Sequence, residues 1–154
     1  MREHGIKLTA ISQFKLNRNA VFGQNAVNIL PRGLAANGSL TSWLAIRNSV
    51  MSKITADYAL PIYIGDLSIG GSMFSIKRLV LTPHFDWTFF GKNSLWSAGT
   101  DLVLDMHSIL TLEWPCSFGV TFSYNGGPAF NSLATESGIT LDRWHVGPTF
   151  NVSF

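Results

Sequence analysis

Apolar and polar residues alternate with a period of two over most of the chain, which is the periodicity of a β-strand. In the last segment the apolar and aromatic residues occupy even positions from Trp144 to Phe154, and small or polar residues occupy the odd ones. Five segments that alternate in this way are predicted to be consecutive antiparallel strands: 48–60, 77–90, 95–108, 111–124 and 139–154. The pattern adds a strand over 5–14 and a weakly patterned one over 20–30.

The charged residues of these segments all lie on the polar face, and none lies on the apolar face. A half-buried sheet of a soluble protein also alternates, but its strands average about 5–6 residues. The five segments are longer than the roughly 9–11 residues that a tilted strand needs to cross a bilayer. Length and a charge-free face together predict a transmembrane β-barrel with apolar residues outside and polar residues inside.

The fold class predicted is therefore all-β, as one antiparallel transmembrane β-barrel domain over 1–154. Segments 31–47 and 125–138 are predicted to be external loops, and 61–76 is predicted to be a long periplasmic turn. Single-chain bacterial barrels have even strand numbers from about eight upward, and unpaired sheet edges are costly in hydrocarbon. We therefore expect an incomplete, C-terminal portion of about six to eight strands. Upstream strands of the same protein, or another subunit, would complete it.

Aromatic residues gather near the predicted strand ends, as in the two interfacial girdles of membrane barrels. The predicted girdle residues are Trp87, Trp96, Tyr124 and Trp144 at the external side, and Tyr58 and Trp114 at the periplasmic side. Aromatic residues in the core of a soluble sandwich need not sort to strand ends.

The composition fits a surface that is partly in lipid. Charged residues make up 13% of the chain, against about 25% in an average soluble domain, and the mean hydropathy is +0.20. The net charge of +2 and the absence of a basic cluster argue against nucleic acid as a partner. The single cysteine, Cys116, excludes an intrachain disulfide. The N-terminus has no signal-peptide pattern, so we expect a mature form or a fragment.

The polar face carries titratable residues from which a metal or acid–base site could be built. They are His84, Asp86, Asp101, Asp105, His107, Glu113 and His145, and Arg78 and Arg143 join them in the predicted lumen polar network. Because barrel interiors are polar in any case, a lumen network of ion pairs and hydrogen bonds is the favoured interpretation. No catalytic, metal-binding or phosphate-binding motif occurs, so no catalytic residue, metal or cofactor is predicted.

The end of the chain resembles the terminal strand by which outer-membrane proteins are recognised for assembly, with Phe150, Val152 and Phe154 on one face. The segments 58–61, 76–79 with 85–86, and 97–102 are similar to the C-terminal strands of surface-antigen-like outer-membrane barrels, including those that follow a periplasmic β-propeller. The pair Arg32-Gly33 resembles the loop motif of that family in which the arginine dips into the lumen, although Leu34 replaces its aromatic residue. The resemblance implies a bacterial outer-membrane location, with membrane lipid and the barrel assembly machinery as partners.

Three functions remain open from the sequence. The first is a barrel segment with a structural, transport or assembly role. The second is an outer-membrane barrel enzyme that acts on lipid or envelope substrates. The third is a soluble β-sandwich binding module, which would need no detergent.

Overall fold

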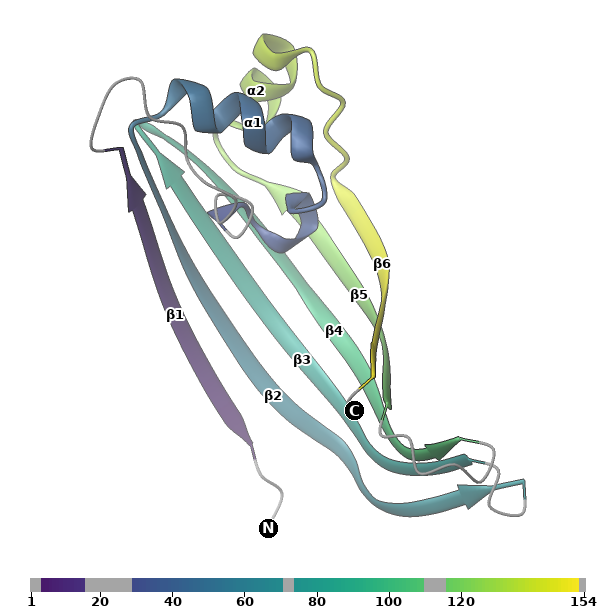
Figure 1. Cartoon of the computed structure of the whole chain (residues 1–154). Helices are drawn as coiled ribbons and strands as arrows, with labels where there is room; N and C mark the ends of the chain where they lie inside the picture. Colours follow the sequence, from purple (N-terminus) through teal and green to yellow (C-terminus); the bar gives the residue numbers. More distant parts are fainter. Residues whose placement is uncertain (1–3, 16–28, 71–73, 110–115, 153–154) are drawn as a thin grey trace.

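The computed structural model describes residues 4–15, 29–70, 74–109 and 116–152 and shows one sheet of six strands in the order β1-β2-β3-β4-β5-β6 (Figure 1). The strands are β1 (Gly5–Phe14), β2 (Val50–Ile69), β3 (Phe74–Phe90), β4 (Asn93–Ile109), β5 (Cys116–Gly126) and β6 (Trp144–Val152). Between them the described residues form the helices η2 (Arg32–Leu34), α1 (Gly38–Arg47) and α2 (Phe130–Ser137). Every pair of neighbouring strands is antiparallel.

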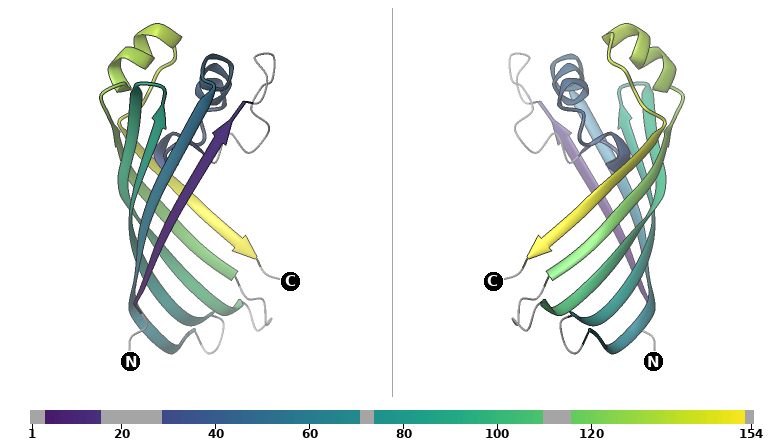
Figure 2. Two further views of the ribbon diagram at one scale, coloured as in Figure 1. Left: turned by 90° about the vertical axis from the view of Figure 1, so that its left-hand side faces the viewer. Right: turned by 90° about the vertical axis from the view of Figure 1, so that its right-hand side faces the viewer.

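The sheet is strongly curved but not closed, with β1 at one edge and β6 at the other (Figure 2). The all-β antiparallel prediction is confirmed, and within the described residues the sheet is not closed into a barrel, as expected. The five clear segments of the sequence pattern correspond to β2 to β6. The weakly patterned strand over 20–30 lies largely outside the described residues; Ile29 and Leu30, which are described, are not in a strand.

The long turn predicted over 61–76 is wrong, because β2 continues to Ile69 and β3 begins at Phe74. The β2–β3 pairing shifts register between Pro61 and Tyr63 and again between Ile64 and Leu67. Each such irregularity displaces the alternation of side chains between the two faces. The sequence therefore loses its period of two here although the strands continue.

The predicted loops 31–47 and 125–138 contain the helices α1 and α2. The side chain of Asn37 caps α1 by accepting a hydrogen bond from the backbone N–H of Leu40 at 3.0 Å. Gly138 ends α2 in the left-handed conformation, with φ of 66°. No helix within the described residues is long and apolar enough to span a membrane.

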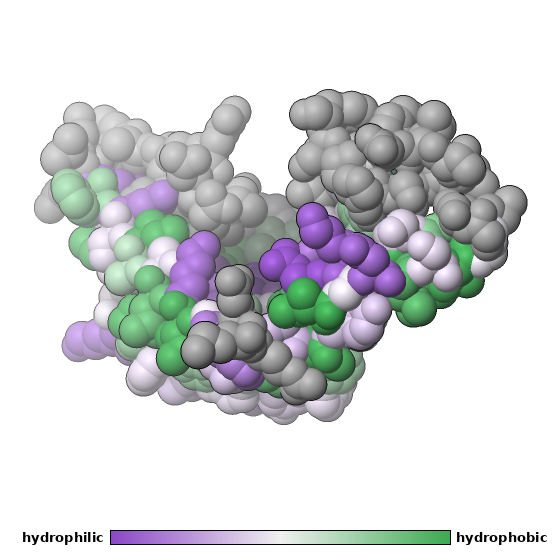
Figure 3. Space-filling model, turned by 90° about the horizontal axis from the view of Figure 1, so that it is seen from below, coloured by the Kyte–Doolittle hydropathy of each residue, from purple (hydrophilic) through white to green (hydrophobic). Residues whose placement is uncertain are grey.

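The two faces of the sheet differ in chemistry as the alternation predicts. On β5, Phe118, Val120 and Phe122 are exposed on the convex face, whereas Ser123 and Asn125 are completely buried on the concave face. Seen from below, the molecule is hollowed and hydrophilic residues line part of the hollow (Figure 3).

The buried apolar core lies at one end of the sheet, beside the helices. Its members come from the 29–34 segment, from both α-helices and from the strand ends next to them: Ile29, Leu30, Leu34, Leu40, Leu44, Met51, Phe90, Leu95, Ala129, Phe130 and Leu133. This core holds the 29–37 segment in place against the sheet.

Candidate functional site

Polar side chains of the concave face bind the backbone of the 29–37 segment. Lys53 Nζ donates to the carbonyl of Leu30 at 2.9 Å, and Thr88 Oγ1 donates to the carbonyl of Ile29 at 2.5 Å. On the far side, Asn125 Nδ2 donates to the carbonyl of Gly33 at 3.3 Å. Three strands thus satisfy backbone groups that would otherwise be buried without partners.

Arg32 projects from this segment into a set of three aspartates on three adjacent strands. Its guanidinium pairs with Asp57 of β2, and its Nη1 lies 2.9 Å from Asp101 Oδ2 of β4. Its Nε lies 3.4 Å from Asp86 Oδ2 of β3, and its backbone N–H donates to the same oxygen at 2.8 Å. The planar fork of an arginine suits several carboxylates at once.

The buried charges of this cluster nearly balance. Asp86 is completely buried, and Lys53 Nζ lies 3.4 Å from its Oδ2. Burial on its own would lower the pKa of the Arg32 guanidinium, but the carboxylates of Asp86, Asp57 and Asp101 raise that pKa above its ordinary value. Arg32 therefore stays charged, and we call Arg32, Lys53, Asp57, Asp86 and Asp101 the Arg32 cluster.

A second polar chain begins at Asp101 and leads away from Arg32. His84 Nδ1 lies 3.4 Å from Asp101 Oδ2, and His84 Nε2 lies 3.3 Å from Ser123 Oγ. The first contact is within ion-pair range but lacks hydrogen-bond alignment, since His84 Nδ1 has no hydrogen-bond partner among the described residues. His84 and Ser123 are both buried.

Gly99 allows His84 to reach across β4, because it is the register partner of both His84 and Ser123. A Cβ at Gly99 would lie 2.1 Å from the carbonyl oxygen of Phe122 and 3.0 Å from His84 Nε2. The sequence alone gave no reason to connect these three residues.

We predict that Gly99→Ala destabilises the protein by about 1–3 kcal/mol, because the added methyl overlaps backbone atoms that cannot move without disturbing the ladder. Denaturant unfolding followed by tryptophan fluorescence measures the effect. Gly38→Ala is the matched control, since a Cβ there meets nothing within 4 Å. Equal stabilities of the two variants would contradict the tight packing at Gly99.

A cavity of about 380 Å³ lies on the concave face beside these groups. Its polar lining includes Arg32, Asp101, Thr121 and His145, and Val103 and Pro148 contribute apolar surface. A second cavity, of about 400 Å³, lies between residues 33–39 and 140–145.

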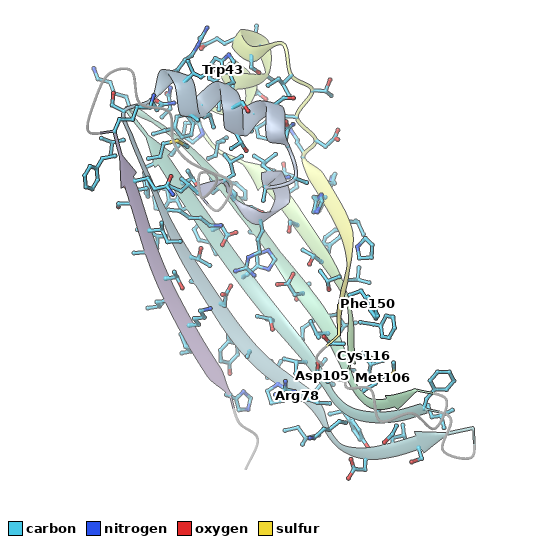
Figure 4. All side chains as sticks on the ribbon, viewed as in Figure 1. Trp43, Arg78, Asp105, Met106, Cys116 and Phe150 are labelled. Carbon is cyan, nitrogen blue, oxygen red and sulfur yellow. The ribbon has the colours of Figure 1, made fainter. Side chains whose placement is uncertain are left out.

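The other residues predicted for the lumen are dispersed. Arg78 and Asp105 form a separate ion pair, with Nη2 and Oδ2 2.7 Å apart, near the end of the sheet away from the helices (Figure 4). Arg143 was predicted to face the lumen, and this is wrong: it precedes β6 and donates to Tyr124 Oη at 3.1 Å and to Asn131 Oδ1 at 3.2 Å. It escapes the alternation because β6 begins only at Trp144. The side chain of His107 and all of Glu113 lie outside the described residues.

The four girdle residues predicted for the external side lie near strand ends on the convex face, whereas Tyr58 lies in the interior of β2, because that strand continues to Ile69. Next to the helices, ring contacts link Trp96 to Tyr124 at 5.8 Å and Tyr124 to Trp144 at 4.7 Å between centroids. Trp87 belongs to the same band through Phe85, 6.4 Å away. Tyr58 stacks on His4 towards the other end, and Trp114 lies outside the described residues.

The terminal residues proposed as an assembly signal are described only in part. Phe150 is exposed on the convex face of β6 and contacts Phe118, with ring centroids 4.7 Å apart. The backbone of Val152 pairs with Cys116, and Phe154 lies outside the described residues.

The geometry supports charge-mediated anchoring of a segment and a Ser–His–Asp chain. Within the described part of the chain, no group of three His, Cys, Asp or Glu residues is placed to hold a metal ion. No protein family, curated protein or solved structure matches the chain. The structure itself defines the class: an all-β protein built on one open antiparallel sheet.

Proposed function

We propose that this chain forms part of a bacterial outer-membrane β-barrel with a structural, transport or assembly role. The observation that carries the proposal is the sorting of side chains between the two faces. Large apolar side chains such as Val120, Phe122 and Val146 are exposed on the convex face, where no element of the described chain covers them. Exposed apolar surface of this extent marks contact with another apolar phase, and a lipid bilayer matches a long, charge-free face.

The concave face supports the same function. Charges of this face are paired, in the Arg32 cluster and between Arg78 and Asp105, as expected for a barrel interior that holds a segment of its own chain. The 29–37 segment fills part of this interior, so any transport through a completed barrel would have to pass or displace it. A polar concave face that holds a segment of the same chain is unlike a soluble sandwich, in which two sheets bury apolar faces against each other.

The two edges of the sheet that are unpaired within the described residues, at β1 and β6, favour the proposal that the chain is part of a larger barrel. Since the six strands alternate in direction, β1 and β6 run antiparallel to each other. In hydrocarbon, each unsatisfied backbone group on these edges would cost several kcal/mol. Further strands, in the simplest case upstream strands of the same protein, would pair with both edges after recognition of the last strand by the assembly machinery.

Two neighbouring positions of β4 test which face meets lipid. Leu102 is exposed on the convex face, and Val103 lines the concave cavity. In a Cys116→Ala background, Leu102→Cys in isolated membranes should react with a lipid-soluble maleimide and resist a charged, water-soluble one. Val103→Cys should show the opposite preference, and the same reactivity at both positions would refute the membrane assignment.

A further inference from the structure

We propose that Ser123, His84 and Asp101 form a nucleophilic relay that can cleave carboxylic esters, kept covered by the 29–37 segment. The proposal rests on side-chain contacts on the concave face and is independent of what the convex face touches. Ser123 was not recognised as a functional residue in the sequence, because its link to His84 depends on the register of β3, β4 and β5.

The order of the contacts is that of a serine nucleophile with its base and orienting acid. His84 Nε2 faces Ser123 Oγ at 3.3 Å, and His84 Nδ1 faces Asp101 Oδ2 at 3.4 Å. The contact of Nε2 with the Ser123 hydroxyl is the one that activates a serine, and Nδ1 lies within ion-pair range of Asp101 without hydrogen-bond alignment, so the relay is complete once that second contact tightens. Contacts of this length are common in free enzymes and tighten when substrate binds.

The three residues are held by rigid elements. Each comes from a different one of three adjacent strands, and the absence of a side chain at Gly99 gives His84 its path to Ser123. Arg32 Nη1 binds the same oxygen, Asp101 Oδ2, at 2.9 Å. Sites built on strands hold their geometry better than sites on loops.

The neighbouring cavity indicates the substrate class. It is lined by Asp101 of the relay and by His145, the register partner of Ser123. Val103 and Pro148 supply apolar surface for an acyl chain, while the charge of Arg32 is taken up by its three aspartates. A small acyl ester fits a cavity of this size with an apolar wall.

The reaction has two steps. Ser123 Oγ bonds to the ester carbonyl carbon while its proton passes to His84 Nε2, and the ester C–O bond breaks as that proton moves to the departing alcohol. Water then attacks the acyl-serine, its proton passes to His84 Nε2 and on to Ser123 Oγ, and the carboxylic acid leaves. The products are one alcohol and one acid for each ester and water consumed.

The 29–37 segment controls access to the nucleophile. Ser123 is completely buried, and the segment lies on the same concave face, where Arg32 Nη1 binds Asp101 of the relay at 2.9 Å, so we expect substrate to reach the Ser123 Oγ when this segment moves away from the sheet. Arg32 is its strongest anchor, and loosening it with Arg32→Gln should raise the rate of reaction at Ser123 several-fold. With the segment in place, the three residues of the relay are together but substrate has no access to Ser123.

A fluorophosphonate probe tests the relay in the full chain, with the labelled residue located by mass spectrometry. We expect labelling of Ser123, its loss in Ser123→Ala, at least a tenfold fall in His84→Gln, and an increase in Arg32→Gln. Ser97→Ala is the matched control, since Ser97 is an equally buried serine of the concave face whose Oγ has no hydrogen-bond partner among the described residues; its labelling pattern should equal that of the unmodified chain.

Two outcomes would overturn the proposal. One is no labelling of Ser123 in either the unmodified chain or Arg32→Gln, with both shown to be folded by their unfolding curves. The other is labelling that persists unchanged in His84→Gln, which would make Ser123 an ordinary hydroxyl. Because His84→Gln could disturb packing, Ser123→Cys gives a second measurement: its alkylation by iodoacetamide should be faster with His84 present than with glutamine there.

Discussion

Replacing Arg32 with alanine should lower the free energy of unfolding by about 3 kcal/mol. Removing one partner from a buried ion pair typically costs about 3–5 kcal/mol, because the other charge stays buried without compensation. The lower end of this range applies to Arg32→Ala, because Lys53, 3.4 Å from Asp86, continues to compensate the buried carboxylate. Urea unfolding of the protein in detergent or lipid, followed by tryptophan fluorescence, measures the loss.

Arg78→Ala is the matched control, because it breaks another arginine–aspartate pair on the same sheet. The Arg78 side chain is 54% exposed, and exposed pairs contribute at most about 1 kcal/mol. The ratio of the two effects therefore reports the burial of the Arg32 cluster. Similar losses in both variants would mean that Arg32 does not anchor the 29–37 segment.

The second large effect is expected for Val120→Arg, which should disfavour insertion into a bilayer by about 2–4 kcal/mol if the position lies near the midplane. Val120 is 50% exposed on the convex face, where the new guanidinium would enter hydrocarbon. The fraction of folded protein recovered in lipid vesicles, as a function of urea, gives the difference from the unmodified chain.

Thr121→Arg is the control one residue further along β5. Thr121 lines the concave cavity, where an added charge would meet polar groups and water, so a milder effect is expected. Equal effects at the two positions would indicate an apolar core on both faces, as in a soluble sandwich, and would contradict the proposed function.

The sequence predicted the strands wherever side chains keep a regular alternation. On β5 and β6 the parity of Val120, Ser123 and Val146 alone gave the correct faces. Between Pro61 and Leu67 the register shifts hide the strand, because the pattern depends on backbone regularity that a bulge removes. The helix α1 was missed inside a predicted loop for a different reason: its stability comes from packing of residues such as Leu40 and Leu44 against the sheet.

The candidate site was only partly accessible to prediction. The placement of Asp57, Asp86 and Asp101 on one face followed from parity, and the resemblance of Arg32-Gly33 to a lumen loop motif suggested where Arg32 could lie. The His84–Ser123 contact could not be derived, since it requires the register of three strands and the missing side chain of Gly99. A contact of this kind depends on which residues of neighbouring strands are paired, and no local sequence pattern indicates that pairing.

The one-sided position of the apolar core implies a gradient of local stability along the strands. Near the helices, a strand end such as Met51 or Leu95 is held by both its ladder and dense packing. Towards the other end of β2, Ile64 and Ile69 are exposed, so the pairing there depends on ladder hydrogen bonds and on whatever surrounds the sheet. Segments with few buried contacts open with the lowest free energy. The sheet is therefore firm at the helical end and compliant at the opposite end, where neighbouring strands or lipid would have the greatest influence on its shape.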